Sequence, residues 1–172
     1  MIGDLTKVVG SDERDAQSDH YRYERKFSVM ALERREIELI LQLNSAAFSA
    51  IYQPRWVNSI YLDTLDSICL SENLNGASQN RVKIRIRWYG DFEGSVSQPT
   101  LELKIRQGQV NRKILFSLSP LNVDRTLSIH TVRGLIRKAD IPPNLMQEIL
   151  KFELAVTNRY HRSYFLSADK AF

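Results

Sequence analysis

The chain has 172 residues, of which 43% are hydrophobic and 26% are charged, so it is long enough for one domain with its own core. A single cysteine, Cys69, excludes an internal disulfide framework and a multi-cysteine zinc site, and the three histidines lie far apart in the sequence. The apolar runs are too short to span a membrane and the N-terminus lacks the apolar stretch of a signal peptide, which predicts a cytoplasmic domain with no transmembrane segment.

The net charge of +4 hides an uneven distribution along the chain. Residues 1–20 contain five acidic and two basic residues, whereas the remainder contains 15 acidic and 22 basic residues. Eight basic residues and only three acidic ones lie between Arg81 and Lys113. Such a concentration is typical of proteins that bind nucleic acid, phosphorylated metabolites or phosphate chains. The alternative is that these charges lie on solvated strand faces, so the faces that they occupy decide the interpretation.

Hydrophobic periodicity and turn signals predict an ordered series of strands and helices after a flexible tail over residues 1–20. The domain that follows spans residues 21–172. Its predicted elements are a strand at Tyr21–Val29, a helix at Ala31–Leu43, a strand at Trp56–Leu62, a short helix at 66–73, strands at Arg81–Tyr89, Thr100–Arg106 and Val110–Leu118, helices at 124–138 and 143–150, and a strand at Phe152–Phe165. Gln107-Gly108-Gln109 predicts a hairpin. About six strands and three or four helices indicate an antiparallel α+β fold.

The predicted strands separate charged from apolar residues by alternation. In the strand at Arg81–Tyr89, period 2 places Arg81, Lys83, Arg85 and Arg87 on one face, and Val82, Ile84, Ile86 and Trp88 on the other. The same rule groups Glu102 with Lys104 and Arg106, Asn111 with Lys113, and Arg22 with Glu24, Lys26 and Ser28. Helices packed on the apolar faces would leave the charged faces pointing at one another, which predicts a β-barrel with a basic lumen suited to a polyphosphate. A half-solvated sheet is the alternative, but its outer face would carry mixed polar residues.

A series of segments, taken in order, resembles one known protein family. They are Tyr21–Phe27, Ser59–Thr64, Asn75-Gly76, Arg81–Gly90, Leu101–Lys104 and Tyr160-His161-Arg162. The series resembles the VTC domain (vacuolar transporter chaperone), the polyphosphate polymerase branch of the CYTH-like triphosphate tunnel metalloenzymes. The likeness covers about residues 21–168, and Lys83–Gly90 is its most specific part.

The resemblance implies an antiparallel β-barrel tunnel, with helices packed outside it, in which inward-pointing Arg and Lys hold a triphosphate. It implies transfer of the ATP γ-phosphate to a growing inorganic polyphosphate chain, assisted by Mn²⁺ or Mg²⁺. Carried over by position, the phosphate ligands would be Lys26, Arg81, Lys83, Arg85, Arg87, Lys104, Lys113 and Arg162. Among them, Arg85, Arg87 and Lys104 would be the catalytic groups. Glu24 and Glu102 would orient neighbouring basic residues or hold the metal ion, and the alternative for each is an ordinary ion pair within the sheet.

The sequence departs from the family pattern in two places. Arg22 stands where the related triphosphatases carry the first Glu of an ExExK metal motif. The chain stops at Phe172, before the strands that supply a further Arg and Asp and a metal-binding Glu in the family. The resemblance therefore implies a barrel that lacks its C-terminal strands and is incompletely closed.

Several functions stay open at this point. Besides the polymerase, the chain could be a non-catalytic module that binds polyphosphate or a nucleoside triphosphate, or a tunnel triphosphatase. No nucleic-acid partner is expected, because Trp88 and the strand isoleucines alternate away from the basic residues. No GxxxxGK[ST] segment occurs, which excludes a P-loop. Arg85→Ala or Arg87→Ala is expected to abolish phosphate-chain binding and leave the fold intact, because each removes an uncompensated like charge.

Overall fold

A computed structural model of the chain describes residues 26–75, 80–107 and 110–169. These residues belong to two compact units, of which the first is Trp56–Tyr160 and the second comprises residues 26–55 and 161–169. Within the described ranges, no helix combines the length and the hydropathy that crossing a membrane requires. The predicted tail over residues 1–20 and the hairpin residues 108–109 lie outside the described residues.

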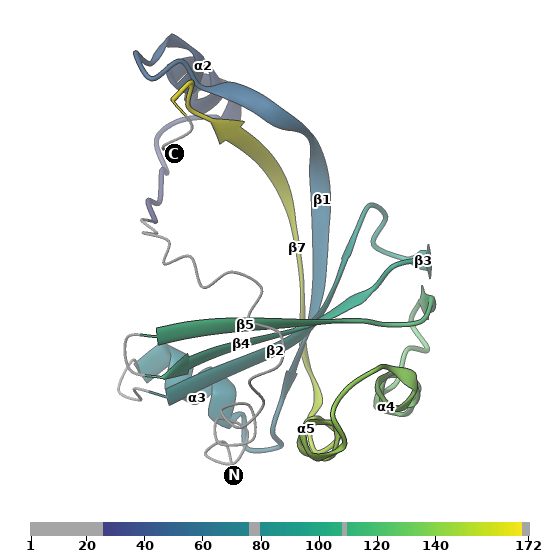
Figure 1. The fold of residues 1–172 in the computed structure, drawn as a ribbon. Coiled ribbons are helices and arrows are strands. Elements are labelled where there is room, and N and C mark those ends of the chain that lie inside the picture. The colour runs from purple at the N-terminus through teal and green to yellow at the C-terminus, as the bar shows by residue number, and fades with distance from the viewer. Residues whose placement is uncertain (1–25, 76–79, 108–109, 170–172) are drawn as a thin grey trace. The chain divides into compact units, whose positions relative to one another are not determined.

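The described elements are strands and helices, and most of the strands follow one another without an intervening helix (Figure 1). In chain order they are α2 (Arg34–Leu43), β1 (Ser49–Asp63), α3 (Ile68–Asn75), β2 (Asn80–Tyr89), β3 (Gly94–Val96), β4 (Thr100–Gln107), β5 (Val110–Ser117), β6 (Leu121–Val123), α4 (Ile129–Lys138), α5 (Pro143–Ile149) and β7 (Glu153–Leu166). Five strands form one sheet in the order β5-β4-β2-β1-β7, and β3 pairs with β6. The pairings of β1 with β2, β2 with β4, and β4 with β5 are all antiparallel. The antiparallel α+β class is confirmed, but over the described residues this sheet is open at β5 and β7 and does not close into a barrel.

The central part of one face of β2 and β4 is apolar. The register places Ile84 opposite Leu103 and Ile86 opposite Leu101, and all four side chains are 0% exposed. Because side chains alternate between the two faces of a strand, the residues between these four point to the other side of the sheet. The alternation that the sequence shows therefore sorts into a core face and a charged face, as predicted.

Helices α3, α4 and α5 lie on the core side of β2, β4 and β5 (Figure 1). Val132 and Ile136 of α4 and Leu145 and Ile149 of α5 are buried in the same apolar cluster as the strand residues. This packing removes apolar surface from water, which stabilises the fold by about 25 cal/mol for each Å² buried.

Local hydrogen bonds fix where two of these helices begin. The buried carboxylate of Asp63 accepts hydrogen bonds from the backbone N–H of Cys69 and of Leu70, each at 2.9 Å, which satisfies donors in the first turns of α3. The Ser128 hydroxyl caps α4 by accepting from the Thr131 N–H at 3.3 Å. Cys69 is buried.

Several of the sequence predictions need correction, among them the start of β1, which lies at Ser49 and not at Trp56. Lys26–Val29, predicted as part of a first strand, is not in a strand, and residues 21–25 lie outside the described residues. Phe27 is 81% exposed, so the alternation there has no packed face to stabilise a strand. The helix predicted from residue 124 starts at Ile129, because the Asp124 carboxylate accepts the Thr126 N–H at 2.7 Å and holds a turn. The three-residue strands β3 and β6 were not predicted, since three residues are too few to show a period.

Candidate phosphate-binding site

A row of three lysines crosses the charged side of the sheet in the first unit. Lys83 of β2 lies directly opposite Lys104 of β4, which lies directly opposite Lys113 of β5. All three side chains are exposed. Like charges opposite one another in an antiparallel sheet repel, so this lysine row lowers the stability of the sheet by itself. A polyanion bound along the row would offset that repulsion.

Charged residues extend the lysine row on both sides. Arg81 lies opposite Arg106, and Arg85 lies opposite Glu102. We call this surface the basic face, and it is made of Arg81, Lys83, Arg85 and Arg87 of β2, Glu102, Lys104 and Arg106 of β4, and Lys113 of β5. Among the described side chains of these three strands, Glu102 is the single acidic one on the face, against seven cations.

The Glu102 carboxylate is buried and is held by three of those cations. Its Oε2 atom lies 2.8 Å from Arg85 Nε and 2.6 Å from Arg85 Nη2. Its Oε1 atom lies 3.1 Å from Arg87 Nη1 and 3.5 Å from Lys113 Nζ. The side chains of Glu102 and Arg87 are 7% and 10% exposed, so the carboxylate lies in a poorly hydrated place, and its two contacts with Arg85 are short and charge-assisted. Three strands are thereby joined through one side chain.

Tyr61 of β1 holds Arg85 from the side opposite Glu102. Arg85 Nη1 donates to the Tyr61 hydroxyl at 3.0 Å, and the guanidinium carbon lies 5.8 Å from the centre of the Tyr61 ring. Burial by itself lowers the pKa of Arg85, but the hydrogen bonds to Glu102 and Tyr61 and the charge of Glu102 together outweigh burial and raise that pKa above its ordinary value. Arg85 is therefore a fixed positive charge with a fixed orientation.

Two buried polar atoms beside this cluster have no hydrogen-bond partner within the described residues. They are Arg87 Nε, a donor, and Ser59 Oγ, which can donate or accept. Ser59 lies opposite Arg87 in the pairing of β1 with β2. Leaving such groups unsatisfied costs about 1–3 kcal/mol each, which is tolerable where a ligand supplies the missing partner. Arg87 Nε and Ser59 Oγ are therefore two enclosed polar groups whose partners the described residues do not supply.

The structure gathers most of the predicted phosphate ligands on one surface. Six of the eight lie on the basic face, namely Arg81, Lys83, Arg85, Arg87, Lys104 and Lys113. The other two, Lys26 and Arg162, belong to the second unit, so the face is built without them. Lys26 is exposed and outside any strand, and Arg162 lies in β7 with its guanidinium carbon 4.6 Å from the Tyr164 ring centre. The candidate metal ligand Glu24 lies outside the described residues.

The expectation that Arg85 and Arg87 are uncompensated like charges is wrong. Both guanidinium groups are paired with Glu102. Alternation placed Glu102 among the basic residues, but it could not show which of them Glu102 contacts. Removing either arginine takes a cation from a buried carboxylate, so it affects stability as well as binding.

Sequence reasoning did not single out Ser59, Tyr61 or Arg106 as members of the site. Ser59 and Tyr61 alternate with Ile60 and Leu62, both of which are buried in the core, so the period of β1 already placed them on the charged side. Arg106 was grouped with Lys104 but was not among the expected ligands. Alternation along the sequence could therefore have identified these three residues as members of the charged side. It could not show which strands lie next to one another, and so which residues meet.

The described residues do not fit a metal ion held by protein side chains alone. Within the described ranges, no group of three or more His, Cys, Asp or Glu side chains is placed to hold one. Glu102 is enclosed by three cations, which repel a dication and occupy its oxygen atoms. Its role as a metal ligand stays a prediction, and the geometry favours the alternative in which it orients its basic neighbours.

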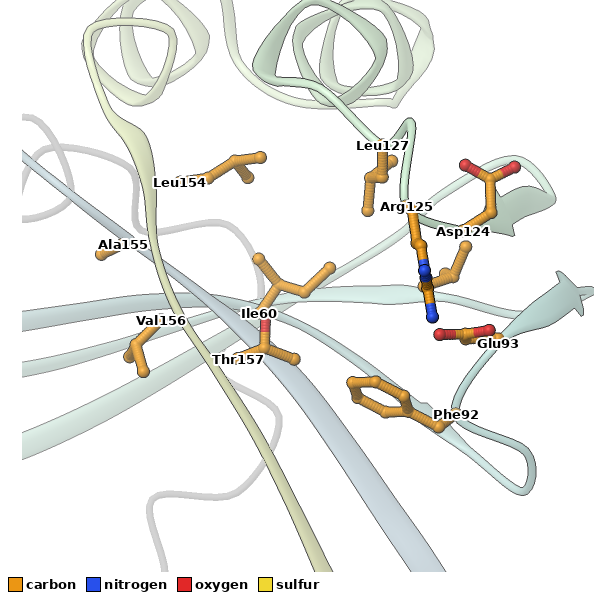
Figure 2. Close-up of a pocket in the computed structure, with 11 residues that line it drawn as sticks. Ile60, Phe92, Glu93, Asp124, Arg125, Leu127, Leu154, Ala155, Val156 and Thr157 are labelled. Carbon is orange, nitrogen blue, oxygen red and sulfur yellow. The ribbon is translucent and has the colours of Figure 1, made fainter.

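A pocket of about 330 Å³ lies on the core side of the same sheet, away from the basic face (Figure 2). Ile60, Leu127 and Leu154 line its apolar part, and Ile60 pairs with Ile86 on the core face. Figure 2 shows the side chains of Arg125 and Glu93 turned toward one another on one wall. The pocket and the basic face therefore lie on different sides of the sheet, and the pocket takes no part in the phosphate site.

These features define an α+β protein with one helix-covered sheet face and one strongly basic sheet face. The family model of the VTC domain matches residues 21–172. The chain therefore belongs to the VTC-domain family, and this membership indicates a polyphosphate-related function. The comparison with curated proteins finds no match.

Proposed function

We propose that this chain is a VTC-type polyphosphate polymerase domain, which transfers the γ-phosphate of ATP to the end of an inorganic polyphosphate chain. The observation that carries the proposal is the lysine row, in which Lys83, Lys104 and Lys113 lie opposite one another on three adjacent strands. Repulsion along the row is offset when successive phosphates of a chain lie across it. Membership of the VTC-domain family supports the same substrate class.

The arginines beside the lysine row suit the chemistry of phosphoryl transfer. In this step an oxygen of the chain's terminal phosphate attacks the γ-phosphorus of ATP, the bond from that phosphorus to the ADP oxygen breaks, and a new P–O–P linkage forms. Catalysis of such a step is mostly positioning and neutralisation of charge on the phosphoryl oxygens. Arg85 and Arg87 offer oriented guanidinium groups, and Lys104 offers a mobile point charge next to them.

The tunnel and the metal ion are further parts of the proposal. The basic face would form one wall of a tunnel around the phosphate chain, and the apolar face with its helices would form the outside. The divalent ion, Mg²⁺ or Mn²⁺, would enter with ATP as part of the substrate, because the described residues offer Glu102 alone and surround it with cations.

The test is to incubate the chain with ATP, tripolyphosphate as primer and Mn²⁺ or Mg²⁺, and to follow the products by phosphorus NMR and gel electrophoresis. We expect ADP to form together with polyphosphate longer than the primer, and the Lys104→Gln variant to be slower. The matched control is Lys138→Gln, which removes the same charge from an exposed position at the end of α4. It should behave as the wild type.

Other outcomes identify the other functions. Inorganic phosphate without chain growth would indicate a tunnel triphosphatase. Saturable binding of tripolyphosphate without turnover would indicate a non-catalytic module. Tighter binding of a single-stranded oligonucleotide than of tripolyphosphate, or no binding of either, would contradict the proposed substrate class.

A further inference from the structure

We propose that Glu102 is a positioning residue that holds the guanidinium groups of Arg85 and Arg87 in one orientation before the phosphate chain binds, and that it does so without a metal ion. This inference rests on the proposed function of the basic face. It assigns the single acidic side chain described on β2, β4 and β5 of that face to the arginines and not to a cofactor.

The geometry fixes Arg85 from both sides. Glu102 Oε2 accepts from Arg85 Nε at 2.8 Å and lies 2.6 Å from Arg85 Nη2, while Tyr61 accepts from Arg85 Nη1 at 3.0 Å. A guanidinium group gripped along one edge and at its far nitrogen cannot rotate without breaking several hydrogen bonds. Arg85 has therefore lost the conformational freedom that an exposed arginine would lose only on binding.

Glu102 positions Arg87 with its second oxygen. The contact from Oε1 to Arg87 Nη1 is 3.1 Å, and it leaves Arg87 Nε without a hydrogen-bond partner among the described residues. Ser59 Oγ, opposite on β1, is likewise unpartnered there. One nitrogen of Arg87 thus fixes the side chain, while Arg87 Nε is buried without a hydrogen-bond partner among the described residues. A site organised in this way loses little entropy when the anion arrives.

The charge balance supports positioning over metal binding. One carboxylate facing Arg85, Arg87 and Lys113 leaves the cluster with a net positive charge, which attracts an anion and repels Mn²⁺ or Mg²⁺. Both carboxylate oxygens already contact cations, so a metal ion would have to displace them. Within the described ranges no second carboxylate, histidine or cysteine completes a group that could hold the ion.

The test is a calorimetric titration of sodium tripolyphosphate into the wild type, Glu102→Gln and Glu93→Gln, with EDTA present, at an ionic strength of about 0.15 M. Glu93→Gln is the matched control, since it makes the same change of net charge at an exposed position outside the basic face. We expect Glu102→Gln to bind about tenfold more weakly in EDTA, the effect of losing one oriented charge-assisted interaction. This loss would occur although the face becomes more positive, and Glu93→Gln should match the wild type.

The same titration has an outcome that would exclude the positioning role. If Glu102 were a metal ligand, Glu102→Gln would bind like the wild type in EDTA and differ from it only when Mn²⁺ is added. That result, with the wild type binding normally, would overturn the positioning role and leave the proposed function standing. If the wild type itself failed to bind tripolyphosphate, the proposed function would fail, and the positioning role with it.

A second variant keeps the test decisive if Glu102→Gln does not fold. Tyr61→Phe removes the acceptor on the other side of Arg85 without changing the charge. We expect about threefold weaker binding in EDTA, with an unfolding midpoint close to that of the wild type. Unchanged affinity in a folded Tyr61→Phe protein would show that the orientation of Arg85 does not matter and would overturn the proposal.

Discussion

The two faces of β2 show how one strand serves both the fold and the site. Ile84 is 0% exposed within the core, whereas its neighbour Lys83 is exposed and lies opposite another lysine. The core face gains stability from burial, and the lysine row on the other face loses some through repulsion. A shift of pairing by one residue would exchange the two sets, so the core face also fixes the register of the basic face.

The basic face is itself divided into two regions. Around Glu102 the charges are paired and mostly buried, and Arg87 is 10% exposed. Along the lysine row the side chains are exposed, and Lys113, which touches both regions, is 51% exposed. Substitutions around Glu102 should therefore change stability and binding together, whereas substitutions of Lys83 and Lys104 should change binding with little effect on stability.

The largest loss of stability is expected on the core face. Ile84→Ala should lower the free energy of unfolding by about 2–5 kcal/mol, because it removes buried methyl groups and leaves a cavity. Urea denaturation followed by fluorescence measures this, with Lys83→Ala on the neighbouring position as control. Equal losses in the two variants would contradict the division of the strand into a core face and a charged face.

The next largest effect is expected for Arg87→Ala. It should lower the free energy of unfolding by about 2 kcal/mol, because Glu102 loses one of its three cations in a buried place. Tripolyphosphate binding should be lost in the same variant. Denaturation and calorimetry on one protein preparation test both, and a variant as stable as the wild type would show that the pair contributes nothing to the fold.

A smaller and opposite effect on stability is expected in the lysine row. Lys104→Gln should keep or slightly raise the free energy of unfolding, by no more than about 0.5 kcal/mol, because it removes repulsion with Lys83 and Lys113. Its affinity for tripolyphosphate should fall about fivefold. Destabilisation by Lys104→Gln beyond that range would show that the row supports the sheet.

The smallest effect on stability is expected in the turn before α4, which belongs to neither face of β2. Hydrogen bonds from the Thr126 hydroxyl and N–H lower the pKa of Asp124 below its ordinary value, so its contribution to stability is present above that value and is lost as the pH falls through the lowered pKa. Asp124→Asn should therefore lower the thermal midpoint slightly at pH 7 and make no difference in strong acid. A gap between the variant and the wild type that persists in strong acid would exclude the carboxylate as its source.

Alternation made the faces of β2 and β4 predictable, because a period of two is a local property of the chain. It placed Arg85 and Lys104 on the same surface without any knowledge of the pairing. It could not show that Lys83 faces Lys104, or that Glu102 reaches two arginines, since register depends on which strands meet. Alternation also predicted a strand at Lys26–Val29, where the structure has none.

The most direct test of the lysine row compares the wild type with the Lys83→Gln/Lys104→Gln double variant by calorimetric titration of tripolyphosphate at an ionic strength of about 0.15 M. At that salt concentration scattered exposed charges are largely screened, whereas a site with positioned cations still binds. We expect saturable 1:1 binding to the wild type and loss of binding in a double variant that stays folded. Equal binding by the two proteins, or no saturable binding to the wild type, would contradict the assignment of the basic face as the phosphate-binding site.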